Sequence, residues 1–320
     1  MTRAFGETPA SWTDWLVLTK FPIAAASTLS ALVVYVLGSG GLRPGLLSLF
    51  GGVLAAAMGA STLNEWQERE LDGRMARTRN RPLPAGRISP AAALALALGL
   101  AGGGTALLWA RFGPVPALLC AAAVLWYNGL YTPLKRWTAL AVVPGSVVGA
   151  LPPAIGWTAA GGSLRDGPLL ALAFFFFLWQ VPHFWLLLFR YGGEYQEAGL
   201  PSFLRRLGGE GLRRVTFSWL AITAASVVFL PLFGAVRTPG AVASLGLSAL
   251  ALGSGSAFLL FRKGGKGGFR AAFGLLNLFV LAVLGCLLAE ALWPTPFWRG
   301  PLETSAVVSR GEGAPSSPLR

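Results

Sequence analysis

Long apolar stretches alternate with short polar segments along most of the chain. Each stretch holds about twenty residues, the length of an α-helix that crosses about 30 Å of hydrocarbon. The pattern therefore predicts an all-α integral membrane protein, a bundle of nine transmembrane helices. The predicted spans cover residues 15–38, 45–63, 90–110, 114–131, 138–159, 168–189, 215–235, 239–261 and 271–292.

The composition fits a chain that lies mostly in the bilayer. Of the 320 residues, 54% are hydrophobic and 12% are charged, whereas about a quarter of the residues of a soluble domain are charged. We expect an N-terminal segment over 1–14, one membrane domain over 15–292 and a disordered tail over 293–320. The first span is too long for a cleavable signal peptide, so we expect it to be retained.

The basic residues are distributed unevenly between the predicted loops. A net charge of +13 would suggest a nucleic-acid ligand in a soluble protein. With the N-terminus on the inner side, however, nineteen of the 26 Lys and Arg residues fall on that side and seven on the other. The positive-inside rule thus predicts a multi-pass protein of the cell (inner) membrane with a cytoplasmic N-terminus and an external C-terminus.

Acidic residues are scarce, and they are clustered. Six of the thirteen lie in two short stretches, each directly after a span that ends on the predicted cytoplasmic side. Carboxylates at a membrane interface are costly to desolvate, so we expect them to be solvated, paired or bound to cations. The six are Glu65, Glu68, Glu70, Asp72, Glu194 and Glu197.

The first acidic stretch continues the predicted helix of the second span. Asn64, Glu68 and Asp72 are spaced i, i+4, i+8, which stacks their side chains along one helix face over roughly 12 Å. We call these three residues the polar ladder. Mg²⁺ prefers oxygen ligands and commonly binds one or two carboxylates together with substrate phosphates. The polar ladder therefore predicts a Mg²⁺ site.

Three basic residues are candidates for binding a diphosphate. Arg77 and Arg81 follow the polar ladder, and Lys135 follows the fourth span just after Pro133, which ends that helix. Guanidinium groups suit phosphate oxygens, and an ammonium group at the same end of the bundle can assist them. For each residue taken alone, a role in setting topology or a position at the lipid interface explains the charge equally well.

The second acidic stretch and the single histidine are weaker signals. Glu194 and Glu197 lie just beyond the sixth span, where i, i+3 spacing would place both carboxylates on one helix face. A solvated helix end would explain this pair as well, and its position on the same membrane side as the polar ladder is what favours metal binding. His183 lies inside the sixth span, where an ionisable residue is a functional candidate or, about as readily, a packing residue.

Four motifs together resemble those of the UbiA-type intramembrane prenyltransferases. The motifs are Asn64-x3-Glu68-x3-Asp72-x2-Met75-x-Arg77-Thr78 leading to Arg81-Pro-Leu, then Tyr131-Thr-Pro-Leu-Lys135-Arg, Gly149-Ala-Leu-Pro-Pro153-x-x-Gly-Trp157 and Trp179-Gln-x-Pro-His-Phe184. They occur in the family's order and cover most of the membrane core. The resemblance is closest to the branch that transfers a farnesyl group to protoheme IX.

This resemblance implies a reaction and a set of site residues. A farnesyl group would pass from farnesyl diphosphate to a vinyl group of protoheme IX, with addition of water, giving heme O and diphosphate for heme A biosynthesis. Mg²⁺ would be the cofactor, and an association with heme A synthase is left open. The implied residues are Asn64, Glu68, Asp72, Lys135 and Glu194 for catalysis, Arg77, Arg81 and Lys135 for diphosphate binding, Asn64, Glu68, Asp72, Glu194 and Glu197 for metal binding, and His183 for the heme acceptor.

The chain departs from the family pattern at a few positions. Glu68 stands where the superfamily usually has Asp, Glu194 begins a motif that commonly starts with Asp, and Ser202 replaces a usual Met. Near the first span, Phe21 separates Lys20 from the proline that usually follows it directly. These departures affect the expected geometry and rate and leave the expected reaction class unchanged.

Two other functions are compatible with parts of the pattern. A sister enzyme that prenylates a quinone precursor or chlorophyllide would share the diphosphate site, but the Trp-Gln-x-Pro-His-Phe motif argues against it. A membrane transporter or heme carrier would carry polar residues in the middle of its spans and repeated halves. Here the acidic residues lie at the ends of spans, and no repeat is evident.

Overall fold

The computed structural model describes residues 10–197, 201, 204–262 and 265–293, and these residues form helices joined by short connections. The longer helices are α1 (Trp12–Leu18), α2 (Phe21–Ser39), α3 (Gly45–Arg74), α4 (Pro90–Phe112), α5 (Pro114–Leu125), α8 (Val147–Ala159), α9 (Gly167–Glu197), α10 (Leu204–Ser226), α12 (Pro239–Ala257) and α13 (Gly265–Leu292). The shorter segments are the π-helix η1 (Trp126–Tyr131), α6 (Thr132–Leu134), the 3₁₀ turn η2 (Ala139–Ala141), α7 (Val142–Gly145), α11 (Phe229–Leu232) and the π-helix η3 (Phe258–Arg262).

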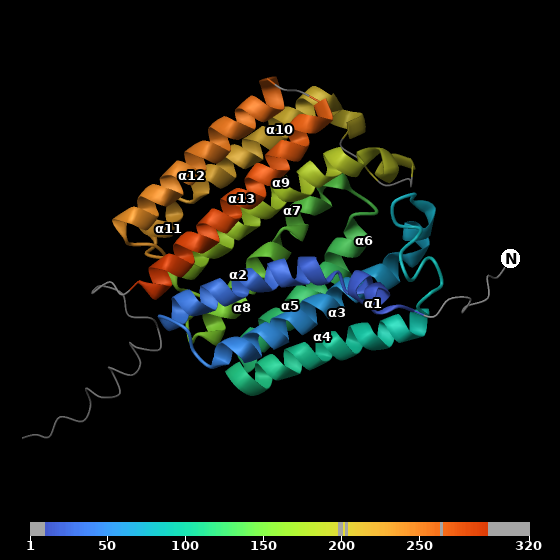
Figure 1. Cartoon of the computed structure of the whole chain (residues 1–320), viewed down its shortest axis with the longest axis horizontal. Helices are drawn as coiled ribbons and strands as arrows, with labels where there is room; N and C mark the ends of the chain where they lie inside the picture. Colours follow the sequence, from blue (N-terminus) through green and yellow to red (C-terminus); the bar gives the residue numbers. More distant parts are fainter. Residues whose placement is uncertain (1–9, 198–200, 202–203, 263–264, 294–320) are drawn as a thin grey trace, which may run out of the picture.

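Nine helical stretches within the described ranges are long and apolar enough to cross a membrane. Consecutive stretches alternate in direction, so their connections collect at two ends of the bundle (Figure 1). The predicted fold class and number of spans are therefore confirmed, and the chain is a multi-pass membrane protein. The stretches are Phe21–Ser39, Gly45–Arg74, Pro90–Phe112, Pro114–Leu134, Ala139–Ala159, Gly167–Leu187, Gly208–Leu232, Pro239–Arg262 and Gly267–Leu292.

The start of the first span differs from the prediction. The predicted span over 15–38 is divided in two, because α1 ends at Leu18 and α2 begins at Phe21. Pro22 lies in the first turn of α2, where a proline fits without loss of a helical hydrogen bond. In a continuous helix the same proline would clash with the preceding turn.

Glycine residues let α3 and α4 pack closely. A Cβ atom at Gly59 would collide with the backbone of Ala101, and one at Gly104 would collide with the Gly52 carbonyl. Small residues at such contacts allow neighbouring membrane helices to approach until their backbones are in van der Waals contact. This contact holds the helix that carries the polar ladder against α4.

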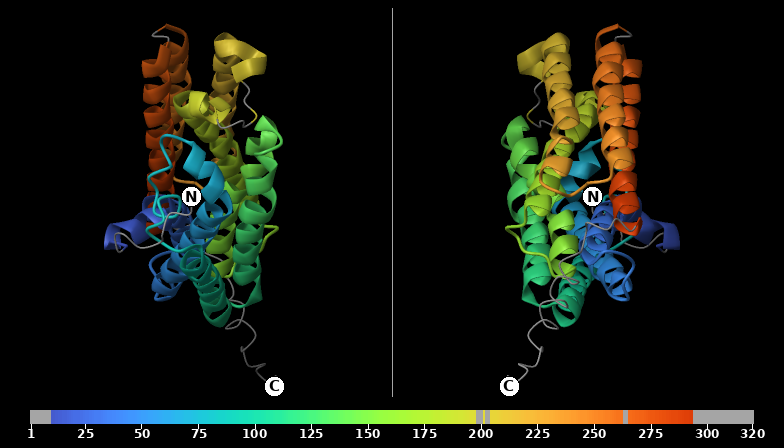
Figure 2. Two further views of the ribbon diagram at one scale, coloured as in Figure 1. Left: turned by 90° about the vertical axis from the view of Figure 1, so that its right-hand side faces the viewer. Right: turned by 90° about the vertical axis from the view of Figure 1, so that its left-hand side faces the viewer.

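The helices form two groups that share α2 and α8. One buried cluster joins these two helices to α3, α4 and α5, and a second joins them to α9, α10, α12 and α13. The views of Figures 1 and 2 agree in placing the second group, coloured yellow to red, beside the group coloured blue to green. The polar ladder lies at the end of α3 that leads into residues 75–89, and we call this the ladder end of the bundle.

Candidate active site

The polar ladder is buried at the ladder end. The exposed fractions of Asn64, Glu68 and Asp72 are 2%, 6% and 3%, and their spacing turns all three toward the same side of α3. Burying an unpaired carboxylate costs several kcal/mol. A buried ladder is therefore compatible with a stable fold only if other segments supply partners for its oxygen atoms.

Each ladder residue has a cationic partner, and two of the three partners come from segments distant in sequence. The pairs are Lys20 with Asn64 (Nζ to Oδ1, 2.9 Å), Lys135 with Glu68 (Nζ to Oε2, 2.6 Å) and Arg81 with Asp72 (Nη1 to Oδ2, 2.7 Å). Asn64 also donates from Nδ2 to Glu68 Oε2 at 3.1 Å, which links two ladder residues directly. The fold thus places Arg81 and Lys135, two predicted diphosphate ligands, against the predicted metal ligands.

Three residues of this cluster were not predicted from the sequence as site residues. Glu65 is 1% exposed and lies 3.4 Å from Arg81 and 3.7 Å from Lys20. Thr132 accepts a hydrogen bond from Asn64 Nδ2 at 3.0 Å and donates one to the Tyr127 carbonyl at 2.9 Å. Glu65 was counted among the clustered acids. The third residue is Lys20, and its only local signal is the proline two residues later.

Lys20 is held in an uncommon backbone conformation. Its φ of 48° is the only positive φ of a non-glycine residue in the described part of the chain, and such a conformation carries strain that the surrounding structure must offset. Burial lowers the pKa of Lys20 to about 8. The positive charges of Arg81 and Lys135 lower this pKa further, whereas the negative charge of Glu65 raises it. The break between α1 and α2 therefore directs this lysine at the polar ladder.

A π-helix lies beside the cluster and presents aromatic side chains to it. Such a turn is rare and often occurs at functional sites. The rings of Tyr127 and Tyr131 in η1 stack with centroids 5.8 Å apart, and Lys135 Nζ lies 5.7 Å from the centroid of Tyr131. Gly145 makes room for Tyr131, because a Cβ atom there would collide with its ring.

The aromatic contacts continue from Tyr131 to the single histidine. Tyr131 stacks on Phe184 at 5.5 Å, and Phe184 contacts the His183 ring edge to face at 6.2 Å. His183 in turn packs against Trp179 and Phe273, with each pair of centroids 4.9 Å apart. A line of aromatic rings thus connects the charged cluster to the candidate acceptor residue.

The oxygen atoms of the cluster suit a hard cation. Glu65 Oε2 and Glu68 Oε1 are buried and have no hydrogen-bond partner among the described residues, and carboxylate oxygens of this kind are ligands for Mg²⁺. Within the described ranges no three Asp, Glu, His or Cys side chains converge closely enough to hold a metal by themselves. The donor set fits an ion that completes its coordination with substrate phosphates and water.

Three further predicted site residues, Arg77, Glu194 and Glu197, lie at or beyond the ends of α3 and α9. Arg77 is exposed in the segment that follows α3. The side chains of Glu194 and Glu197, at the end of α9, lie outside the described residues, and so does Ser202. Most of the predicted tail, from residue 294 onward, lies outside them too.

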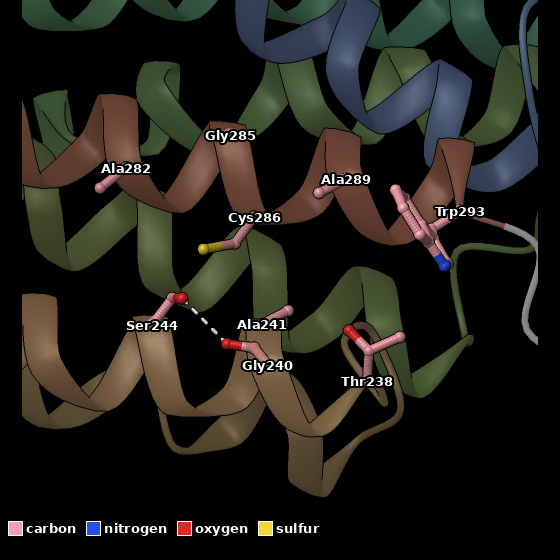
Figure 3. A pocket seen from close by; sticks show the side chains of 9 residues that line it. All are labelled: Thr238, Gly240, Ala241, Ser244, Ala282, Gly285, Cys286, Ala289 and Trp293. Carbon is pink, nitrogen blue, oxygen red and sulfur yellow. Dashed lines mark hydrogen bonds between the residues drawn. The ribbon is translucent and has the colours of Figure 1, made fainter.

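A cleft at the opposite end of the bundle has a different character. It lies between α12 and α13, has a volume of about 480 Å³ and is lined mostly by small side chains, as Figure 3 shows. Thr238 and Trp293 mark its outer end, and Ser244 uses its hydroxyl to bond the Gly240 carbonyl. Among the described residues, no acidic or basic side chain lines the cleft, so the charged cluster at the ladder end is the better candidate for an active site.

The fold and the site together define a class, that of multi-pass α-helical membrane proteins with a buried charged site at one end. The chain belongs to the UbiA prenyltransferase family, which it matches over residues 25–278. It is 48% identical over 220 residues to protoheme IX farnesyltransferase of Geobacter sulfurreducens, covering 68% of this chain and 81% of that protein. It is 35% identical to the protein of the same name from Rhodopseudomonas palustris, and the match covers 88% of this chain and 91% of that protein.

A solved structure shares the fold. The UbiA homolog from Archaeoglobus fulgidus bound to GPP and Mg²⁺ superposes with a TM-score of 0.59 at 17% identity, covering 86% of this chain and 99% of that one. At this level of identity the comparison establishes a common fold.

Proposed function

We propose that this chain transfers a farnesyl group from farnesyl diphosphate to a vinyl group of protoheme IX, with addition of water, giving heme O and diphosphate. The observation that carries the proposal is the buried cluster of three cations and three carboxylates at the ladder end. Charge-assisted contacts of this kind suit a diphosphate and its counter-ions. Two relatives named for protoheme IX farnesyl transfer support the choice of donor and acceptor.

The donor half of the site is assigned from the cluster. We assign Mg²⁺ binding to Asn64, Glu68, Asp72, Glu194 and Glu197, diphosphate binding to Arg77, Arg81 and Lys135, and catalysis to Asn64, Glu68, Asp72, Lys135 and Glu194. When bound, Mg²⁺ supplies positive charge that makes the diphosphate a better leaving group. Arg81 and Lys135 already lie against ladder carboxylates, so both cations are in place to neutralise charge on the departing diphosphate. A likeness to a homolog bound to GPP and Mg²⁺ supports this assignment.

The acceptor half is assigned from the aromatic line. The stacked faces of Tyr127 and Tyr131 lie next to Lys135, where their negative electrostatic potential can stabilise an allylic cation as the farnesyl group leaves. His183 lies two ring contacts beyond Tyr131, and we place the heme on that side. The surrounding side chains are apolar rings, which limits early capture of the cation by bulk water.

We also propose an orientation and a location. The ladder end faces the cytoplasm of a cell (inner) membrane, the N-terminus lies on the same side, and the C-terminus is external. The asymmetry of basic residues between the two ends supports this orientation. Farnesyl diphosphate would then reach the charged cluster from the aqueous side, while protoheme would enter from the bilayer.

One reconstitution tests the reaction. Purified full-length protein is given farnesyl diphosphate, protoheme IX and Mg²⁺, and the expected product is a heme that carries a hydroxyethylfarnesyl group in place of one vinyl group and is heavier by one farnesyl and one hydroxyl group. Removing divalent metal with a chelator should stop the reaction, and Mg²⁺ should restore it. Transfer to an aromatic acid alone would establish the sister enzyme instead, and heme movement across vesicles without any product would establish a carrier.

A further inference from the structure

One face of α9 carries a pair of buried nitrogen atoms that have no hydrogen-bond partner among the described residues. They are Nε1 of Trp179 and Nδ1 of His183. The two residues are four positions apart and therefore share one face of the helix, and their ring centroids are 4.9 Å apart. A buried polar group left unpaired costs about 1–3 kcal/mol. Two such groups side by side therefore point to a small polar ligand that contacts both.

The hydrogen bonds of Asn277 indicate which nitrogen of the imidazole carries the proton. Asn277 on α13 hydrogen-bonds the His183 side chain, and since Nδ1 is unpartnered this contact is made by Nε2. The Asn277 amide nitrogen donates one of its two hydrogens to the Phe273 carbonyl at 2.9 Å, and we assign the amide oxygen as the acceptor of the hydrogen bond from Nε2–H. The neutral imidazole then has a lone pair on Nδ1.

The pair therefore combines one donor with one acceptor. Trp179 Nε1–H can only donate a hydrogen bond, and His183 Nδ1 in this tautomer can only accept one. A water molecule satisfies both, because its oxygen accepts from the indole while one of its hydrogens is donated to the imidazole. A carbonyl or carboxylate oxygen could satisfy the indole alone and would leave the imidazole nitrogen unpaired.

The position of the pair relates it to the transfer reaction. Phe184 and Phe273 are the other rings packed on His183, and Phe184 stacks on Tyr131, over which Lys135 lies. The two nitrogens thus sit in an aromatic setting that leads directly to the proposed diphosphate site. Water held there would be separated from the allylic donor by aromatic rings.

We propose that Trp179 and His183 hold the water molecule that adds to the farnesylated vinyl group, and that His183 removes its proton. The inference rests on the proposed function and deepens it by naming a general base and a water-binding group. Asn277 is a positioning residue, because it fixes the tautomer in which Nδ1 can accept the proton.

The bond between farnesyl C1 and the diphosphate oxygen breaks, and its electron pair leaves with the diphosphate. The π electrons of the vinyl group form the new bond from its terminal carbon to farnesyl C1, which leaves a cation on the vinyl carbon next to the pyrrole. The oxygen of the held water bonds to that carbon, and its proton passes to the lone pair on His183 Nδ1. Without the water, the same cation loses a neighbouring proton and gives an alkene, a product lighter by one water.

The ratio of alcohol to alkene product is therefore the measurement. The purified full-length parent and the variants His183→Gln, Trp179→Phe and Asn277→Leu are given farnesyl diphosphate, protoheme IX and Mg²⁺, and the heme products are separated by mass. The ratio should fall about 10²-fold or more in His183→Gln, the scale of a lost general base. Loss of one hydrogen bond in Trp179→Phe should lower it by about 10-fold, and Asn277→Leu should also favour the alkene.

Trp157→Phe is the matched control. It makes the same chemical change at an indole whose Nε1–H donates to Asp166 at 2.8 Å, at the opposite end of the bundle, so the product ratio should stay at the parent value. If His183→Gln does not accumulate, the conservative Trp179→Phe variant carries the test.

Three results separate the possible failures. A parent that farnesylates no heme contradicts the proposed function itself. If the parent makes the alcohol and the variants give the same ratio of alcohol to alkene, whatever their turnover rates, the water-binding assignment is overturned. An unchanged ratio in His183→Gln together with an altered absorption band of bound heme would also overturn it, by showing that the imidazole binds the iron.

Discussion

At the scale of single residues, the ladder end is a buried set of balanced charges. Three carboxylates face three cations within 4 Å of one another, and the members are Glu65, Glu68, Asp72, Lys20, Arg81 and Lys135. Removing one partner of a buried pair commonly costs about 3–5 kcal/mol, because the other charge is left uncompensated. Variants in this cluster therefore need a readout of folding beside the readout of activity.

Asp72→Asn tests the metal-binding role of the polar ladder. The variant keeps the size of the side chain and an oxygen for Arg81, but it removes one negative charge from the proposed Mg²⁺ site. We expect farnesyl transfer to fall about 10²-fold, the scale of one lost electrostatic stabiliser of a transition state. The Mg²⁺ concentration needed for half-maximal rate should rise, while heme binding persists.

Glu70→Gln is the matched control for this prediction. Glu70 lies on the same helix two residues away, but its side chain is 80% exposed, so both activity and Mg²⁺ dependence should remain those of the parent. Equal activities and unfolding temperatures in the two variants would show that Asp72 has no part in metal-dependent transfer.

Lys20 provides a prediction on pH. Because its pKa is lowered to about 8, Lys20 is charged below that pH and loses its charge as the pH rises through it. The part of the activity that depends on the Lys20 charge should fall over the same range. In Lys20→Arg the guanidinium stays charged, so kcat/KM should persist to higher pH than in the parent. Identical alkaline limbs in both proteins would assign the fall to another group.

At the scale of elements, the helix that carries the ladder depends on its contact with α4. Gly59→Ala should lower the free energy of unfolding by about 1–3 kcal/mol, as for other overpacked contacts, because the added Cβ meets the backbone of Ala101. Thermal unfolding in detergent measures this. Gly102→Ala on α4 is the control, since a Cβ there meets nothing within 4 Å, and it should be neutral or slightly stabilising.

The break between α1 and α2 shows how an element boundary forms part of the site. Hydropathy alone predicted one span from residue 15, since apolar residues continue on both sides of Lys20. The structure ends α1 at Leu18 and starts α2 at Phe21. A straight helix through this segment would carry Lys20 in a different direction. The proline two residues later explains the break, and the hydrogen bond to Asn64 and the ion pair with Glu65 explain the direction of the lysine.

At the scale of the whole molecule, the orientation in the membrane can be tested directly. We expect a reporter fused after Arg320 to be external, because an N-terminus on the side with nineteen of the 26 basic residues, followed by nine spans, places the two termini on opposite sides. A reporter fused after Arg87, which follows the second span, should be cytoplasmic. Cytoplasmic activity of the reporter after Arg320 would mean that the number of spans is wrong by one.

The sequence by itself determined the features that depend only on residues close together along the chain. The nine spans follow from the length of each apolar stretch, because every residue in hydrocarbon must satisfy its backbone groups within its own helix. The polar ladder follows from the period of the helix, because residues four apart share a face whatever lies opposite them. The four motifs identified the family for the same reason, since each is a short run of residues.

Only the tertiary structure decided which distant residues complete the site. The contact of Lys20 with Asn64 joins residues 44 positions apart, and that of Asn64 with Thr132 joins residues 68 positions apart. No local pattern records such pairs, because they depend on the angles at which several helices cross. The aromatic line from Tyr131 to His183 and the two unpartnered nitrogens beside it have the same origin. Packing of the helices brings these rings together, and the buried setting makes an unpaired nitrogen costly enough to indicate a ligand.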